Sequence, residues 1–163
     1  TAEEIWSELP GERPASVFLS EFTDLSAAAR SEVDWPALIR VRESVAKALE
    51  GLRDTGGIGS ALEASVTVYA DGELRKALTT LGDELRFVLI TSEVTVADWG
   101  SAPQTAMEAE GLALRIVAEP ASSDKCERCW HRRPDVGEHA THPTLCGRCV
   151  SNIEGPGEVR QFA

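Results

Sequence analysis

The chain has 163 residues, and its 16 Lys and Arg stand against 27 Asp and Glu, for a formal net charge of −11. Such an acidic balance argues against a free-standing nucleic-acid-binding protein, which is usually basic. Hydrophobic residues make up 42% of the chain, as in ordinary globular proteins, and no apolar run approaches the length of a membrane span. We therefore expect a globular protein that does not contact a membrane.

The first ten residues predict a short amphipathic helix. Thr1 suits the N-cap position, Glu4 follows three residues later, and Pro10 and Gly11 end the pattern. The apolar residues on one face of this helix are Ile5, Trp6 and Leu9. Because a helix begins so close to the first residue, which is not Met, we expect the chain to be part of a larger protein.

A second, longer helix is predicted to begin after Asp34 and to end near Arg53. Asp34 suits the N-cap position, and Pro36 falls in the first turn, where proline is tolerated. Apolar residues recur at three- and four-residue intervals at Leu38, Val41, Val45, Leu49 and Leu52. This spacing predicts an amphipathic helix of about five turns.

The next segment predicts a small αβ unit that begins with a glycine-rich turn at residues 55–60. No Gly-Lys-Ser/Thr sequence follows, so this turn is not a phosphate-binding loop. Residues 62–69 alternate and are rich in β-formers, which predicts a strand, and a helix is expected from Asp71 until Gly82 breaks it.

Further strands are expected at residues 93–97 and 112–118, which gives a sheet of about three strands. Residues 86–91 fit a helix and a strand equally well, and the sequence does not decide between them. No Ser/His/Asp or Cys/His catalytic set is available in this unit, because every histidine follows residue 130.

All four cysteines lie near the end of the chain, in two Cys-x2-Cys pairs separated by 16 residues. They are Cys126, Cys129, Cys146 and Cys149. This spacing predicts one structural zinc ion held by four thiolates, with no open position for catalysis. Paired disulfides, a redox Cys-x2-Cys pair and free structural cysteines are the alternatives. Thiols suited to a metal also indicate a reducing compartment, so we expect a cytoplasmic protein.

Three histidines lie in or near the cysteine-rich segment and could each replace a cysteine ligand: His131, His139 and His142. Four cysteines already complete a tetrahedron, so we expect no histidine ligand. Residues 119–124 read as a linker by composition. We therefore predict three parts: residues 1–55, residues 56–120, and a zinc ribbon with its tail at residues 121–163.

The ribbon resembles the carboxyl end of bacterial isoleucyl-tRNA synthetase, a class I aminoacyl-tRNA synthetase. The resemblance rests on Cys-x2-Cys-Trp-His at residues 126–131, Asp-Val-Gly at 135–137, Leu-Cys-Gly-Arg-Cys-Val-Ser-Asn at 145–152 and the glycine-containing tail at 155–163. Weaker resemblances precede it, in Ile-Trp-x-x-Leu-Pro-Gly at residues 5–11 and in the sequence that follows Ile58.

This resemblance implies an α+β chain that comprises the end of a helical anticodon-binding bundle, the αβ unit and the ribbon. The intact family joins isoleucine to its tRNA using ATP, and the resemblance implies that this part helps hold the anticodon arm. The family's His-Ile-Gly-His and Lys-Met-Ser-Lys-Ser signatures are absent from these residues. We therefore expect no catalysis by this part alone, with ATP and Mg²⁺ bound only by the rest of the enzyme.

We expect tRNA contacts on the ribbon, because residues 125–149 carry five Lys or Arg against three Asp or Glu, about +2, while the remainder is about −13. A zinc knuckle is too small to bury an indole, so Trp130 is free to stack on an unpaired base. The basic candidates around it are His131, Arg132, Arg133 and Arg148. The alternative is that Trp130 packs against the αβ unit and that the arginines keep the ribbon soluble.

Two other functions compete with this interpretation. A related zinc ribbon ends the DNA glycosylases that excise damaged bases, but the N-terminal proline nucleophile and the helix-two-turn-helix of those enzymes are not visible here. A zinc ribbon can also bind protein alone. We expect a monomer that binds isoleucine tRNA and not DNA, and the isoleucine identity rests on the resemblance only.

Overall fold

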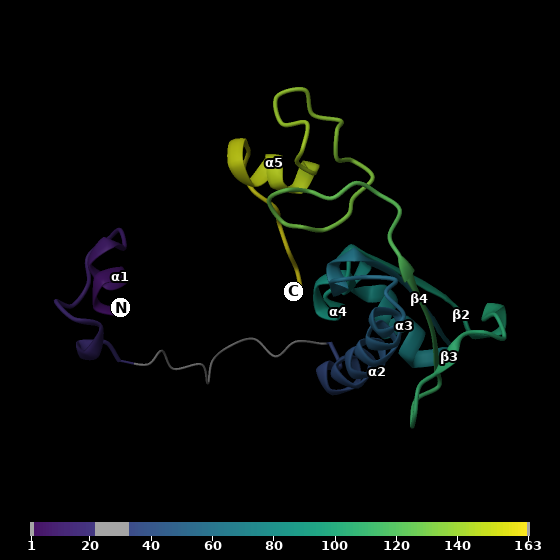
Figure 1. Ribbon diagram of the computed structural model, residues 1–163. Coiled ribbons are helices and arrows are strands. Elements are labelled where there is room, and N and C mark those ends of the chain that lie inside the picture. The colour runs from purple at the N-terminus through teal and green to yellow at the C-terminus, as the bar shows by residue number, and fades with distance from the viewer. Residues whose placement is uncertain (1, 22–32, 163) are drawn as a thin grey trace. The chain divides into compact units, whose positions relative to one another are not determined.

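The computed structural model describes residues 2–21 and 33–162, which fall into two compact units, Thr1–Glu32 and Val33–Ala163 (Figure 1). The first unit contains helix α1 (Ala2–Glu8) and a 3-10 turn at Val17–Leu19. The helix predicted at the start of the chain is thus confirmed, while its expected N-cap, Thr1, lies outside the described residues.

Side chains close the first unit around an indole. The Trp6 Nε1–H group donates to the carbonyl oxygen of Pro14 at 2.9 Å, and the Arg13 guanidinium donates to the carbonyl oxygen of Trp6 at 2.7 Å. The same guanidinium lies 5.4 Å from the centre of the Trp6 ring. These contacts fold the segment after α1 back along the helix.

The second unit begins with α2 (Trp35–Asp54), which follows the predicted pattern. The Asp34 carboxylate accepts from the backbone N–H of Ala37 at 3.1 Å, and Pro36 lies in the first turn. Four of the predicted apolar positions are buried: Leu38, Val41, Val45 and Leu49. Among the described residues no helix is both long enough and apolar enough to span a membrane.

A four-stranded sheet follows, in the order β2-β1-β4-β3. Its strands are β1 (Ala64–Ala70), β2 (Glu93–Asp98), β3 (Met107–Glu108) and β4 (Leu114–Pro120). β1 pairs parallel with β2 and antiparallel with β4. The expected three strands correspond to β1, β2 and β4, and the fourth, β3, is a two-residue edge strand between the second and third of them in the chain.

The parallel pair requires a crossover, because two parallel strands cannot be joined by a tight turn. The crossover consists of α3 (Gly72–Thr80), a 3-10 turn at Gly82–Glu84 and α4 (Leu85–Leu89). The segment that the sequence left undecided is therefore mainly helical. It ends at Ile90, whose left-handed backbone, with a φ of 57°, turns the chain into β2.

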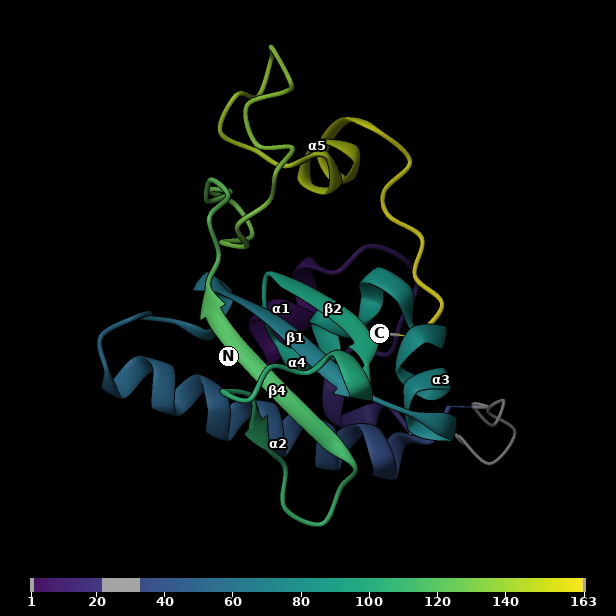
Figure 2. The same cartoon turned by 90° about the vertical axis from the view of Figure 1, so that its right-hand side faces the viewer.

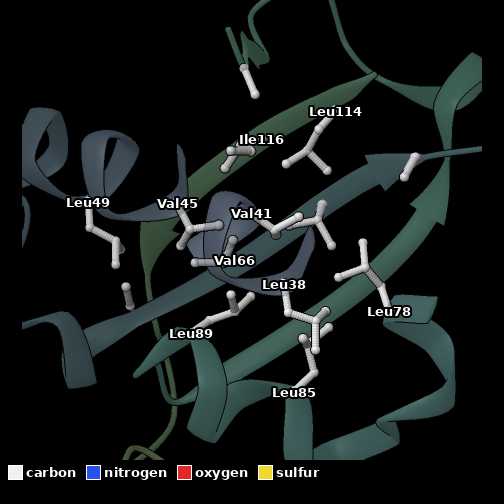
Figure 3. Packing of buried hydrophobic residues seen from close by; sticks show 14 of the residues in the cluster. Leu38, Val41, Val45, Leu49, Val66, Leu78, Leu85, Leu89, Leu114 and Ile116 are labelled. Atoms are coloured by element: carbon white, nitrogen blue, oxygen red, sulfur yellow. The ribbon is translucent and has the colours of Figure 1, made fainter. Parts of the chain in front are cut away.

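The helices share one core on one face of the sheet. Alternate residues of β1 are buried, and Val66 on this face packs with Leu38 of α2 and Leu85 of α4 (Figure 3). Figure 2 shows α2 running along the sheet. The apolar stripe of α2 therefore belongs to the same core as the sheet and α4.

Two neighbouring residues of α2 provide a test of this core. Leu38 is completely buried, whereas the side chain of Ile39 is 51% exposed. We expect Leu38→Ala to lower the free energy of unfolding by about 2–5 kcal/mol, because it leaves a cavity, and Ile39→Ala to lower it by less than about 1 kcal/mol. Chemical denaturation of both variants measures the difference, and equal losses would contradict the described packing.

Candidate functional site

The first cysteine pair lies in a tight backbone turn. The backbone N–H of Cys126 donates to the carbonyl oxygen of His131 at 2.9 Å, and that of Trp130 donates to the carbonyl oxygen of Cys126 at 2.9 Å. An isolated antiparallel bridge between Lys125 and Arg132 closes the base of this turn. These bonds define the first knuckle, residues 125–132, and bring Cys126 and Cys129 to one side of it.

The second pair lies at the start of α5 (Gly147–Glu154). Cys146 occupies the N-cap position, and Cys149 falls in the first turn and is buried. The Asp135 carboxylate accepts from the backbone N–H of Gly147 at 2.8 Å and so supplies a negative charge where the N-terminal end of a helix favours one. This bond ties the loop between the pairs to the second cysteine pair, Cys146 and Cys149, which forms the second knuckle.

The four cysteine Sγ atoms all lie within 4.8 Å of one another. The Sγ atoms of Cys129 and Cys146 are 3.7 Å apart, close to the roughly 3.8 Å edge of a tetrahedron with 2.3 Å metal–sulfur bonds. Cys126, Cys146 and Cys149 are buried. The cluster therefore fits a closed structural zinc ion, as the spacing predicted.

The backbone favours thiolates within this cluster, although burial opposes them. Burial raises the pKa of Cys126, but the backbone N–H groups of Cys129, Cys146 and Arg128 outweigh it and lower this pKa to about 6. Burial raises the pKa of Cys146 to about 12. Four neighbouring thiols, three of them buried, cannot all ionise beside one another without a cation, and a divalent metal supplies that charge.

The histidines lie outside the cluster of four cysteines. His131 is buried, and its ring packs edge-on against Phe87 with the ring centres 5.8 Å apart. Burial, together with the charges of Arg86 and Arg148, lowers the pKa of His131 to about 4, so this ring is neutral at neutral pH. His142 Nε2 lies 2.7 Å from a carboxylate oxygen of Glu154. The close metal-ligating group among the described residues consists of the four cysteines.

Trp130 is the most exposed of the predicted tRNA-binding residues. Its backbone is left-handed, with a φ of 66°, and 62% of its surface is exposed. The Nζ atom of Lys125 lies 5.7 Å from the centre of the indole ring. The structure thus leaves the ring available for stacking and places one ammonium group beside it.

The other predicted tRNA-binding residues make contacts within the chain. Arg132 donates to the carbonyl oxygen of Ser123 at 3.2 Å. Arg133 lies 3.6 Å from a carboxylate oxygen of Asp83, and Arg148 lies 2.9 Å from one of Glu158. With His131 buried, the structure does not bring the five candidates together as one exposed basic surface.

The ribbon is docked on the αβ unit. The predicted linker is wrong in its first residues, because β4 continues through Pro120 and the backbone N–H of the buried Ala121 donates to the carbonyl oxygen of Glu63 at 2.8 Å. The Glu84 carboxylate accepts from the backbone N–H groups of Gln161 and Phe162, each at 2.7 Å. Figure 1 shows this tail, in yellow, running from α5 back towards α4.

The docking surface centres on Phe87, which sequence reasoning missed. Two guanidinium groups from the ribbon and its tail, those of Arg148 and Arg160, lie 5.3 and 3.8 Å from the centre of its ring. The Arg86 guanidinium lies 4.0 Å from it. No local pattern signals this role, because most of these partners lie more than 40 residues away in the sequence.

Comparison with known proteins agrees with this geometry. Residues 123–152 match a family model described as a zinc finger found in FPG and IleRS. The whole chain is 50% identical to the isoleucine–tRNA ligase of Shewanella woodyi, 51% to that of Shewanella sediminis and 48% to that of Pseudomonas paraeruginosa. The chain is similar throughout to isoleucine–tRNA ligases. The predicted resemblance to the C-terminal part of this family is therefore confirmed.

The chain spans only 18% of the length of these isoleucine–tRNA ligases, although each alignment covers all of the chain. The similarity extends beyond the zinc finger to α2 and the sheet. The match to these ligases therefore does not rest on the zinc finger alone.

Removal of one thiol tests the metal centre. We expect Cys149→Ser to reduce bound zinc from about one per chain to well below that and to unfold the ribbon, because structural zinc contributes on the order of 10 kcal/mol to such small units. His142→Ala is the matched control and should keep its zinc, since this side chain contacts Glu154. Metal analysis of reduced protein measures both, and zinc lost equally from the two variants would contradict an all-cysteine site.

Proposed function

We propose that the chain is the C-terminal tRNA-binding part of an isoleucine–tRNA ligase and that it helps hold the anticodon arm of isoleucine tRNA. The observation that supports this most strongly is the similarity of the whole chain to enzymes of that name at about half identity. In this proposal the complete enzyme joins isoleucine to its tRNA with ATP and Mg²⁺ in the cytoplasm, as a monomer.

The chemistry belongs to the rest of the enzyme in this proposal. These residues contain neither of the nucleotide-binding signatures of the class, and no Ser/His/Asp or Cys/His set occurs in the αβ unit. His131, which follows the first cysteine pair, is buried against Phe87, and its lowered pKa keeps it neutral at neutral pH. The part described here therefore serves binding and not catalysis.

One zinc ion held by Cys126, Cys129, Cys146 and Cys149 is the structural basis of the proposed binding surface. In this proposal zinc takes no part in a reaction, and its charge allows four neighbouring thiolates to coexist. The ion would fix the two knuckles relative to each other. Without that constraint the ribbon has little apolar core of its own, because its buried cluster is formed mainly by the cysteines themselves.

The RNA contact is proposed at Trp130, with Lys125 beside it. An exposed indole stacks on any unpaired base, and the ammonium group of Lys125 suits the adjacent phosphate. The other four candidates have a supporting role in this proposal and not the direct RNA contact that the sequence suggested: Arg132, Arg133, Arg148 and His131. In this proposal they support the knuckle, because their side chains bind within the chain.

A DNA glycosylase and a protein-binding zinc ribbon remain the alternatives. The family model that matches the ribbon also takes its name from FPG, so the zinc finger by itself does not separate the first alternative. The similarity of residues outside the finger favours the ligase. We therefore propose RNA, and not damaged DNA, as the partner.

Binding measurements on the full chain test this proposal. We expect it to bind isoleucine tRNA more tightly than unrelated RNA or damaged duplex DNA, and we expect Trp130→Ala to weaken tRNA binding by about 5- to 150-fold, the equivalent of roughly 1–3 kcal/mol of stacking. Zinc content should not change, because the indole is exposed and is not a ligand.

Ile153→Ala is the matched control for this measurement. Ile153 is also an apolar residue of the ribbon and is 49% exposed, but it lies on α5. The Ile153→Ala variant should bind tRNA as tightly as the parent chain does. Equal affinity of the parent and Trp130→Ala would remove the proposed contact, and preference for damaged DNA would favour the glycosylase.

A further inference from the structure

Ser92 connects the αβ unit to the first knuckle through its hydroxyl group. It lies immediately before β2 and is completely buried. Its Oγ atom accepts a hydrogen bond from the backbone N–H of Arg132 at 2.6 Å and donates one to the carbonyl oxygen of Leu62 at 2.5 Å. A hydroxyl group can do both at once, because it has one proton and two lone pairs.

The backbone of Ser92 is held on both sides as well. Its N–H group donates to the carbonyl oxygen of Ala64 at 3.1 Å, which fixes it to the start of β1. Its carbonyl oxygen accepts from the Arg133 guanidinium at 3.3 Å. Two successive ribbon residues, Arg132 and Arg133, therefore bind one residue of the αβ unit, 40 and 41 positions earlier in the chain.

The knuckle transmits this anchor to Trp130. Arg132 is bridged to Lys125 across the base of the knuckle, and the carbonyl oxygen of His131 accepts from the backbone N–H of Cys126. The backbone N–H of Trp130 donates to the carbonyl oxygen of Cys126. Because Arg132, His131 and Trp130 are all bonded to the opposite side of the turn, at Lys125 and Cys126, holding Arg132 in place also sets where the exposed indole points.

We propose that Ser92 is a positioning residue for tRNA binding, which acts by orienting the indole of Trp130 relative to the αβ unit. This inference rests on the proposed function. The thiol cluster fixes the shape of the knuckle, but the thiols lie within the ribbon and cannot fix the ribbon to the sheet. Ser92 supplies that second constraint through hydrogen bonds to Arg132 and Arg133, two and three residues after Trp130.

The ribbon has other contacts that keep it docked when the hydroxyl is lost. His131 packs against Phe87, and the Glu84 carboxylate holds the backbone of the tail. Ser92→Ala should therefore fold and bind zinc. The substitution removes the hydrogen-bond partner of both the Arg132 N–H group and the Leu62 carbonyl oxygen. We expect the first knuckle to shift, because these two groups must then bind other partners.

The test compares Ser92→Ala with Thr91→Val in the full chain. Thr91 is also completely buried and its hydroxyl donates to the carbonyl oxygen of Glu93, within the αβ unit. We expect Ser92→Ala to weaken binding of isoleucine tRNA by about fivefold or more, with zinc content unchanged, because a misplaced indole stacks poorly. Thr91→Val should bind within about twofold of the parent, since it leaves the knuckle in place. Ser92→Cys, which keeps a weaker donor and acceptor, should fall between Ser92→Ala and the parent.

A double-mutant cycle separates positioning from a general loss of structure. If Ser92 acts through the indole, Ser92→Ala should change affinity by less than about twofold in a chain that already carries Trp130→Ala. An undiminished effect in that background would overturn the proposal, as would parent-like affinity of Ser92→Ala. If Ser92→Ala does not fold, the comparison of Ser92→Cys in the two backgrounds decides in the same way. If Trp130→Ala alone binds isoleucine tRNA as tightly as the parent chain does, the proposed RNA contact is overturned instead.

Discussion

The convergence of four thiols is the constraint on which the zinc ribbon, about the last quarter of the chain, depends. The ribbon buries few apolar side chains in a core of its own: its buried cluster consists of Cys126, Cys146 and Cys149, with Cys129, Val136 and Leu145 packed against them. Such a segment cannot offset its conformational entropy by hydrophobic burial. A metal ion that joins the two knuckles supplies the missing stabilisation, and backbone N–H groups prepare Cys126 for it by lowering its pKa.

A second constraint makes the ribbon part of a larger unit. The αβ unit presents Phe87, Glu84 and Ser92 at one end, and the ribbon and its tail bind all three. The contacts are of different kinds: ring packing and guanidinium stacking at Phe87, charge-assisted hydrogen bonds at Glu84 and a shared hydroxyl at Ser92. Together they explain how a ribbon without a core of its own adopts one orientation on the sheet.

The charges of the ribbon take on a different meaning in this arrangement. Its arginines give the segment a positive balance in an otherwise acidic chain, which suggests contact with phosphates. In the structure Arg133 pairs with Asp83, and Arg148 and Arg160 pair with Glu158. Charge that appears free in the sequence is thus largely paired within the chain, and the most exposed of the five predicted tRNA-binding residues is an aromatic one, Trp130.

The sequence by itself determined the elements whose causes are local. The apolar spacing of α2, its Asp34 cap and the alternation of β1 all follow from neighbouring residues, and the paired cysteines indicate their metal because spacing alone controls whether four thiols can meet. Residues 86–91 were ambiguous since a short apolar run fits both periods, and the parallel pairing of β1 with β2 decided for the helix α4. Only the tertiary structure decided the roles of Ser92, Phe87 and His131. Most of their partners lie some 30 to 73 residues away along the chain, and no local pattern records a contact that exists only after the sheet and the zinc ribbon have come together.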